Sequence, residues 1–149
     1  MITQLGKQKL EEHLKQLQKE LDRTCEDRGK AAEEGDLKEN SAYIFLGERA
    51  LVLYSQIDQV KADLKTAVVQ SAPTQTDTVV FGSLIKIKFE SDSREMEITL
   101  VGKNDSNLKP GWISCDSPLG QALLNQPLGA KVSVNDQLVT ILDIGIGDI

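Results

Sequence analysis

Two heptad patterns joined by a short polar turn constrain the fold of this 149-residue chain more than any other feature. Steps that alternate between three and four residues place one seam along one side of a helix, as in a coiled coil. The first seam consists of Leu10, Leu14, Leu17, Leu21, Thr24, Arg28 and Ala31. The second consists of Tyr43, Leu46, Ala50, Leu53, Ile57, Val60, Leu64 and Ala67. Two seams with a short connection predict an antiparallel coiled-coil hairpin over residues 1–70.

The expected helix ends follow from residue type. Thr3 is a suitable N-cap for the first helix, and Gly35 is placed to end it as the residue after the last turn. Asp36 and Glu39 fit a capping box, with Asp36 at the N-cap and Glu39 at the third position of the second helix. Arms of about 25–30 residues would extend roughly 40–45 Å. Such a rod is too slender to enclose an active-site cavity, but it can insert into a partner.

The pattern changes after the second seam. Residues 71–78 are polar and include Pro73, which predicts a linker. Residues 79–149 then alternate with period two, as in strands with one buried face. Strands are expected at 85–89, 96–100, 112–114, 131–134 and 137–143, with turns at 91–94 and 135–136. Ser117 and Pro118 predict the capped start of a short helix. The predicted fold class is α+β: the hairpin, followed by a small antiparallel-sheet domain with one short helix.

Composition excludes several classes of function. The net charge is −6, and neither half is basic: residues 1–70 carry 11 basic and 13 acidic side chains, and residues 71–149 carry 6 and 10. Electrostatic binding to the nucleic-acid backbone requires a basic face, so any role of this chain in nucleic-acid chemistry must be indirect. No apolar run approaches the ~18 residues of a membrane span, and no signal-peptide pattern opens the chain. Cys25 and Cys115 lack metal-ligand spacing, and we expect a reduced, cytoplasmic protein.

The carboxylates of Asp36 and Glu39 have two readings. As a capping box they would stabilise the second helix through its N-terminal amides and dipole. As ligands at the end of a rod they would bind a divalent cation such as Mg²⁺, which prefers oxygen donors. Two acids bind Mg²⁺ weakly, so the second reading requires a partner that supplies other ligands. The spacing alone leaves both readings open.

Three segments resemble the bacterial Gre family of transcript cleavage factors, the GreA/GreB type. The first is the turn itself, Gly35-Asp36-Leu37-Lys38-Glu39-Asn40-Ser41-Ala42-Tyr43. The second is the start of the first helix, from Thr3 to Leu17, and the third is Ser117-Pro118-Leu119-Gly120 with the leucines that follow. The resemblance spans the chain in order. It implies an N-terminal hairpin, residues 71–78 as linker, and residues 79–149 as an FKBP-like domain.

The resemblance also implies a function. Such factors enter the secondary channel of bacterial RNA polymerase and stimulate the polymerase's own cleavage of backtracked RNA, so the chain would not be an enzyme by itself. Its contact with the nascent RNA 3′ end and with DNA would be indirect, with no membrane partner, and we expect a monomer. Mg²⁺ would be shared with the polymerase active site and not bound by the factor alone.

Residue roles carry over by position. Asp36 and Glu39 would be the catalytic residues and the Mg²⁺ ligands in trans. Support for the tip would come from Asn40, Ser41 and Tyr43, and the docking surface would include Ser117, Pro118, Leu119 and Gly120.

Two departures favour an alternative function. Ala42 stands where many members of the family carry an acid, and Gly47 stands where a basic residue is common. The alternative is a channel-binding regulator that inhibits or modulates the polymerase without promoting cleavage. A coiled-coil chaperone or proline isomerase is a third reading. It suits the sequence poorly, because residues 71–149 contain only three large aromatic side chains, Phe81, Phe89 and Trp112.

Overall fold

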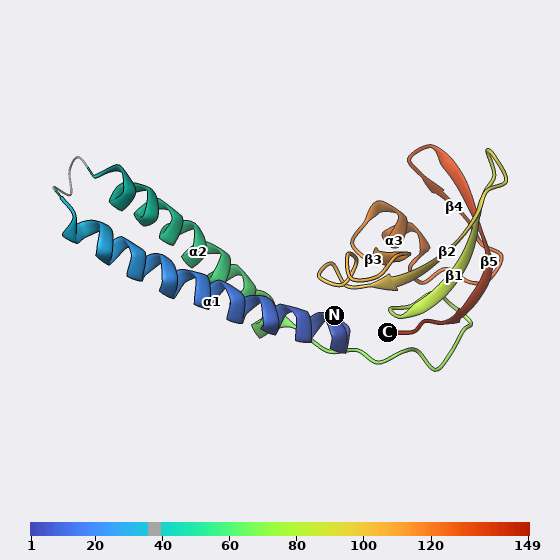
Figure 1. Cartoon of the computed structure of the whole chain (residues 1–149). Helices are drawn as coiled ribbons and strands as arrows, with labels where there is room; N and C mark the ends of the chain where they lie inside the picture. Colours follow the sequence, from blue (N-terminus) through green and yellow to red (C-terminus); the bar gives the residue numbers. More distant parts are fainter. Residues whose placement is uncertain (36–39) are drawn as a thin grey trace. The chain divides into compact units, whose positions relative to one another are not determined.

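The computed structural model describes residues 1–35 and 40–149. The elements in chain order are α1 (Gln4–Glu33), α2 (Ser41–Thr66), β1 (Ser83–Phe89), β2 (Glu95–Val101), β3 (Trp112–Ser114), α3 (Pro118–Leu123), β4 (Lys131–Val134) and β5 (Gln137–Ile146) (Figure 1). They form two compact units. The hairpin unit is Gln8–Thr66, and the sheet unit combines Met1–Lys7 with Ala67–Ile149. The predicted class, two long helices followed by a small sheet domain with one short helix, is confirmed.

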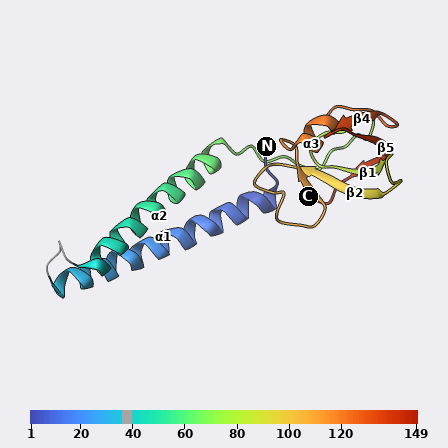
Figure 2. The same ribbon diagram turned by 90° about the horizontal axis from the view of Figure 1, so that it is seen from above.

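In the hairpin unit, α1 and α2 lie side by side in both views (Figures 1 and 2). Their contact is made by the predicted seams. Its buried centre is Leu17, Leu53, Ile57 and Val60, and Leu10, Leu14, Leu21 and Leu64 pack around it. Thr24, Ala31 and Ala50 are also buried. An ion pair between Glu20 and Arg49 crosses between the helices. Both heptad predictions are therefore confirmed, except that Ala67 lies beyond the end of α2 and belongs to the sheet unit.

The two ends of α1 differ in how well the sequence predicted them. The amide of Gly6 donates to Thr3 Oγ1 at 2.9 Å, so Thr3 is the N-cap as expected. At the other end, α1 stops at Glu33, and the amide of Glu34 donates to the Ala31 carbonyl. Gly35 lies beyond the helix and does not have a positive φ. Gly35 is thus at the predicted C′ position, after Glu34 as the C-cap, but it does not adopt the left-handed conformation of a glycine cap.

The start of the chain is held in the sheet unit by a buried carboxylate. Asp105 is fully buried and accepts hydrogen bonds from Thr3 Oγ1 at 2.7 Å and from the amide of Gly102 at 3.1 Å. The amide of Thr3 also donates to Asp105. A bridge between Ile2 and Val69 adds backbone hydrogen bonds. These contacts explain why residues 1–7 group with the sheet.

The sheet has five strands in the order β3-β2-β1-β5-β4. All neighbours are antiparallel except β2 and β3, which are parallel, with Thr99 opposite Trp112. The expectation of a purely antiparallel sheet is therefore wrong at this one pair. Parallel neighbours need a crossover connection. Residues 102–111 form this connection, because they lead the chain from the end of β2 back to the level at which β2 begins its pairing with β3.

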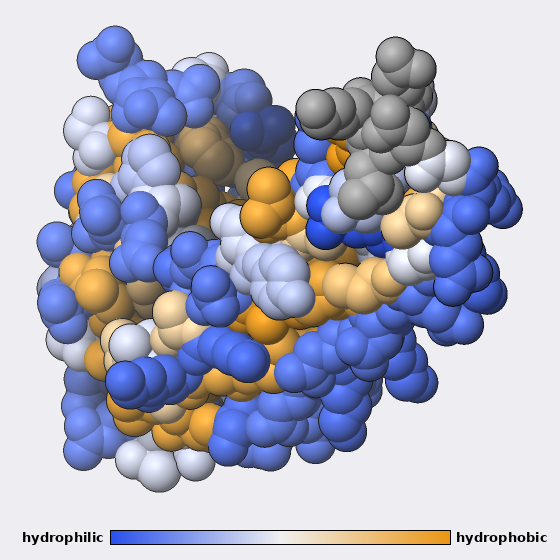
Figure 3. Space-filling view, turned by 90° about the vertical axis from the view of Figure 1, so that its left-hand side faces the viewer, coloured by the Kyte–Doolittle hydropathy of each residue, from blue (hydrophilic) through white to orange (hydrophobic). Residues whose placement is uncertain are grey.

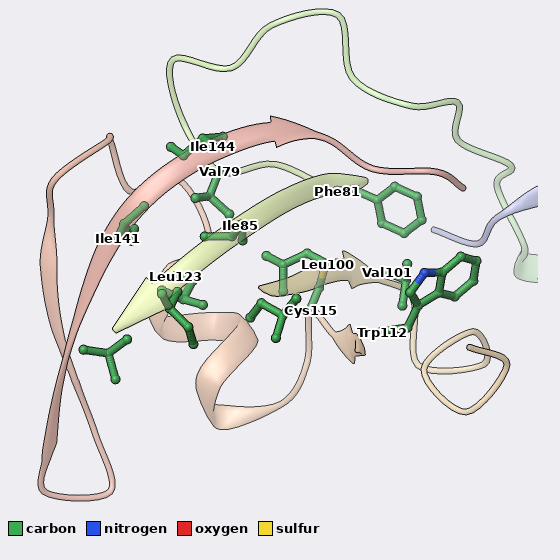
Figure 4. Packing of buried hydrophobic residues seen from close by; sticks show 13 residues of the cluster. Val79, Phe81, Ile85, Leu100, Val101, Trp112, Cys115, Leu123, Ile141 and Ile144 are labelled. Carbon is green, nitrogen blue, oxygen red and sulfur yellow. The ribbon is translucent and has the colours of Figure 1, made fainter. Parts of the chain in front are cut away.

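The core of the sheet unit lies on one face of this sheet, where α3 also packs (Figure 4). Ile85 and Ile87 point into it and are fully buried, as the period-two pattern predicted. The other buried members are Val79, Phe81, Ile98, Leu100, Val101, Trp112, Cys115, Leu123, Val139, Ile141 and Ile144. The predicted turn at 135–136 has positive φ at both Asn135 and Asp136, as tight hairpins require.

Within residues 1–35 and 40–149, no helix is both long and apolar enough to cross a membrane.

Candidate functional site

The two carboxylates that the sequence singles out, Asp36 and Glu39, lie outside the described residues. The described residues around them are therefore the basis for judging this end of the hairpin. We call Arg28, Ala31, Asn40, Tyr43 and Gly47 the hairpin end, because they come from the last turns of α1, the residue before α2 and the first turns of α2. Their contacts decide which side chains cap the helices and which do not.

Asn40 is the N-cap of α2. The amide of Tyr43 donates to Asn40 Oδ1 at 3.1 Å, and the amide of Ile44 donates to the Asn40 carbonyl at 3.1 Å. The prediction that Asp36 is the N-cap of the second helix is wrong, because α2 begins at Ser41 and the position before it already holds a strong capping residue. The N-cap position of α2 therefore belongs to Asn40.

Asn40 also joins the two helices. Its Nδ2 donates to the carbonyl oxygen of Ala31 at 2.6 Å, and this oxygen also accepts from the amide of Glu34 in the last turn of α1. Both the oxygen and the nitrogen of the Asn40 side-chain amide are therefore hydrogen-bonded, and the side chain is half-buried. Ser41, the other small polar residue assigned to the tip, is exposed at the first position of α2. Of these two residues, Asn40 has the contacts of a supporting residue.

Tyr43 supports a second contact between the helices. The guanidinium carbon of Arg28 lies 4.1 Å from the centre of the Tyr43 ring, a cation–π arrangement. The Arg28 Nε is buried without an acceptor among the described residues. Gly47 makes room for this group, since a Cβ there would lie 2.9 Å from Arg28 Nη2. Sequence reasoning missed Arg28 as part of the site. The available signal was a charged residue at a seam position that otherwise holds leucine.

The predicted docking residues have mainly structural contacts. Ser117 Oγ accepts from the amide of Gly120 at 3.0 Å and donates to the Ser114 carbonyl at 2.7 Å. Gly120 is buried, and a Cβ there would lie 2.1 Å from the Ser114 carbonyl oxygen. Leu119 packs against the core, and only Pro118 is exposed. The capped helix start is confirmed, and the docking role stays a prediction.

A metal centre and an aromatic-lined pocket are two further kinds of site that a small domain can carry. Residues 1–35 and 40–149 contain no group of three or more His, Cys, Asp or Glu side chains arranged for a metal ion. A cavity of about 570 Å³ in the sheet unit is lined by Phe81 together with Pro73, Leu124 and Asn125. Trp112 is buried in the core instead of lining this cavity. The cavity is not the aromatic-lined pocket that proline isomerases use.

Comparisons with known proteins cover nearly the whole chain. Residues 1–69 match a family profile described as "Transcription elongation factor, N-terminal", and residues 74–145 match one described as "Transcription elongation factor, GreA/GreB, C-term". A protein of Syntrophomonas wolfei named transcription elongation factor GreA is 34% identical over 145 residues, which cover 95% of this chain and 90% of that protein. A protein of the same name from a Nitratiruptor species is 31% identical over 134 residues, or 89% and 82% of the two chains.

Solved structures include similar chains. The crystal structure of the GreA factor homolog 1 protein of Thermus thermophilus has 19% sequence identity and a TM-score of 0.45, with 97% of each chain covered. A GreA/GreB elongation factor from Nitrosomonas europaea has 25% identity and a TM-score of 0.40, covering 65% of this chain and 91% of that one.

Proposed function

Because the chain belongs to the GreA/GreB family of transcription elongation factors, we propose that it stimulates cleavage of backtracked RNA by RNA polymerase. In this proposal the hairpin enters the secondary channel of the polymerase, and the sheet unit docks outside, with Pro118 on the docking surface. The hydrolytic reaction belongs to the polymerase. The factor supplies groups that the polymerase active site lacks, and by itself it has no activity.

The observation that carries the proposal is the cap made by Asn40. A helix needs one N-cap, and Asn40 fills that position for α2 with both its side-chain oxygen and its carbonyl. Asp36 and Glu39 are two acids in the short connection between the arms, and the N-cap position of α2 is held by another residue. This supports the reading in which their carboxylates act on a partner.

Carboxylate oxygens are suitable donors for Mg²⁺, and two of them complete a site only where other ligands are already present. Mg²⁺ bound there would stabilise charge on the attacking and leaving oxygens of phosphodiester hydrolysis. The part of this chain is to bring Asp36 and Glu39 to that place and to accept a hydrogen bond from the attacking water. Asn40 fixes the spacing of the two arms on either side of the acids.

The test is transcript cleavage in stalled polymerase complexes, with the purified factor added. Asp36→Asn and Glu39→Gln remove one charge each and keep size and polarity. We expect stimulation to fall about 10- to 100-fold, the range seen when a residue supporting a metal site is lost. Glu33→Gln is the matched control, since Glu33 is an exposed acid in the last turn of α1. Full stimulation by both variants would contradict the proposed role of the acids.

A regulator that occupies the channel without promoting cleavage is the second candidate. It is favoured by Ala42 and by Gly47, whose place beside Arg28 leaves no room for a large side chain. The same assay separates the two functions. Slower RNA synthesis without new short 3′ fragments would support the regulator, and an increase in those fragments supports cleavage.

A further inference from the structure

The first half of α2 exposes more apolar surface than a solvated helix normally does. Leu51 is 70% exposed, and Tyr54 and Ile44 are 51% and 46% exposed. The apolar residues next to the tip reach the surface in Figure 3, where they are orange beside the grey residues. A helix that is apolar outside its packed seam usually has another partner. We call Ile44, Gly47, Leu51 and Tyr54 the α2 face.

The α2 face is hollowed. A depression of about 360 Å³ is lined by these four residues together with Arg28, Tyr43, Glu48 and Ala50. Gly47 forms the low point because it has no side chain, and Leu51 stands one turn further along the same face. Because Gly47 has no side chain, a second helix can approach this face closely, and Leu51 supplies apolar contact surface.

Opposite charges flank this face. Successive residues of an α-helix are rotated by about 100°, so Gly47 and Tyr54 lie on the side nearer α1, and Glu48 lies on the side away from it. Arg28, which reaches over from α1, lies at the same level as Glu48, since it contacts both Tyr43 and Gly47. Within residues 1–35 and 40–149, neither Arg28 nor Glu48 has an ion-pair partner.

We propose that two copies of this chain associate through the α2 face, related by a two-fold axis that runs along α2. Rotation about such an axis keeps each residue at its own level and exchanges the two sides of the face. Leu51 then meets Leu51 of the second copy, and Glu48 of one copy lies opposite Arg28 of the other. Each contact occurs twice, as an isologous interface requires. A surface that carries a cation on one side and an anion on the other is self-complementary in this arrangement.

The charge pattern selects a second copy over an unrelated partner, because both members of the missing ion pair come from this chain. An antiparallel pairing would place like charges on the same side and is disfavoured. The inference does not depend on the proposed function, and it is an alternative to the expectation of a monomer.

Sedimentation equilibrium of the full chain, over a range of protein concentrations, tests the association. We expect a reversible dimer in the micromolar range. Leu51→Glu places an acid at the centre of the interface and should weaken the dimer by about tenfold or more. Leu128→Glu is the matched control, because Leu128 is 57% exposed in the sheet unit. A chain that stays monomeric at all concentrations would overturn the proposal.

A charge exchange tests the pairing of Glu48 with Arg28. Glu48→Arg and Arg28→Glu should each weaken the dimer, and the double variant should restore most of the lost affinity. Helical circular dichroism, measured in parallel, confirms that each variant is folded. Glu48 is exposed, so its single variant is informative even if Arg28→Glu disturbs the hairpin. Association that is unaffected by Glu48→Arg would contradict the cross-pairing.

Disulfide trapping tests the direction of the two helices. In a Cys25→Ser background, Leu51→Cys should form a disulfide-linked dimer quickly under mild oxidation, because position 51 meets its own copy. Gln56→Cys, on the opposite side of α2, should not. Equal cross-linking of the two variants, or none with Leu51→Cys, would overturn the parallel two-fold arrangement.

Discussion

The side-chain amide of Asn40 donates a hydrogen bond to the carbonyl oxygen of Ala31 at 2.6 Å, while the oxygen of the same amide caps α2. Asn40 therefore makes hydrogen bonds both at the end of α1 and at the start of α2. The contact lies immediately beside the connection that carries Asp36 and Glu39. It fixes how the two arms are spaced where the connection leaves them, and a change in this residue acts on both arms at once.

Asn40→Ala should destabilise the hairpin by about 2 kcal/mol, since it removes the N-cap of α2 and the hydrogen bond to the Ala31 carbonyl. Urea unfolding followed by helical circular dichroism measures this loss. Asn40→Asp is the informative comparison. Aspartate caps as well as asparagine but cannot donate to Ala31, so part of the loss should remain. Equal stability of the Asp variant and the parent chain would show that the bond to Ala31 contributes nothing.

Asp105→Asn should destabilise the sheet unit by about 3 kcal/mol. The fully buried carboxylate accepts hydrogen bonds from Thr3 and from the amide of Gly102. The side-chain NH2 of asparagine cannot accept, so at least one of these N–H or O–H groups would lose its acceptor. The fluorescence of Trp112, the chain's one tryptophan, reports unfolding of this unit. Asp116→Asn, at an exposed position, should change the free energy of unfolding by less than about 0.5 kcal/mol.

Gly29→Ala and Gly47→Ala should differ although both lie inside helices. A Cβ at Gly29 meets nothing within 4 Å, so alanine should stabilise the hairpin by about 1 kcal/mol through helix propensity. At Gly47 the same gain is offset, because the Cβ moves the Arg28 guanidinium off Tyr43 and loses a contact of about 0.5–1 kcal/mol. Thermal unfolding of both variants measures the difference. Equal stabilisation would mean that the Arg28 contact has no energetic value.

Burial raises the pKa of the Cys115 thiol, and the nearby Asp116 carboxylate acts in the same direction. The thiol of the unfolded chain thus ionises at lower pH than that of the folded chain. The stability contributed by the neutral thiol is complete below the ordinary pKa of about 8.5 and is lost as pH rises through the raised value. In the Cys115→Ala variant this loss at alkaline pH should be absent. Unfolding of both proteins followed by Trp112 fluorescence between neutral and alkaline pH checks the difference.

The seams were predictable because burial along a helix repeats every three or four residues. Leu17, Leu53 and Ile57 lie where that period places them, and Ile85 and Ile87 follow the period of a strand in the same way. The short motif at Ser117 was also predictable, since its cap involves residues three apart in the chain. Periodic burial and local hydrogen bonds leave a signal within a few residues.

The predictions that were wrong concern contacts between residues far apart in the chain, or a choice between nearby residues that suit the same position equally well. Asp36 and Asn40 are both good N-caps, and the sequence did not show where α2 would begin. The parallel pairing of β2 with β3 depends on the path of residues 102–111, and the burial of Asp105 depends on Thr3, far away in the chain. No local pattern encodes these partners.

The sequence by itself determined the two helices, the alternating strands, the family and the two acids at the turn, because each is a pattern of neighbouring residues. The tertiary structure decided that Asn40 caps α2, that Arg28 lies over Tyr43 in the space left by Gly47, and that Leu51 remains exposed beside them. The physical reason is that these contacts join residues from opposite arms. Their geometry exists only after the seams have packed.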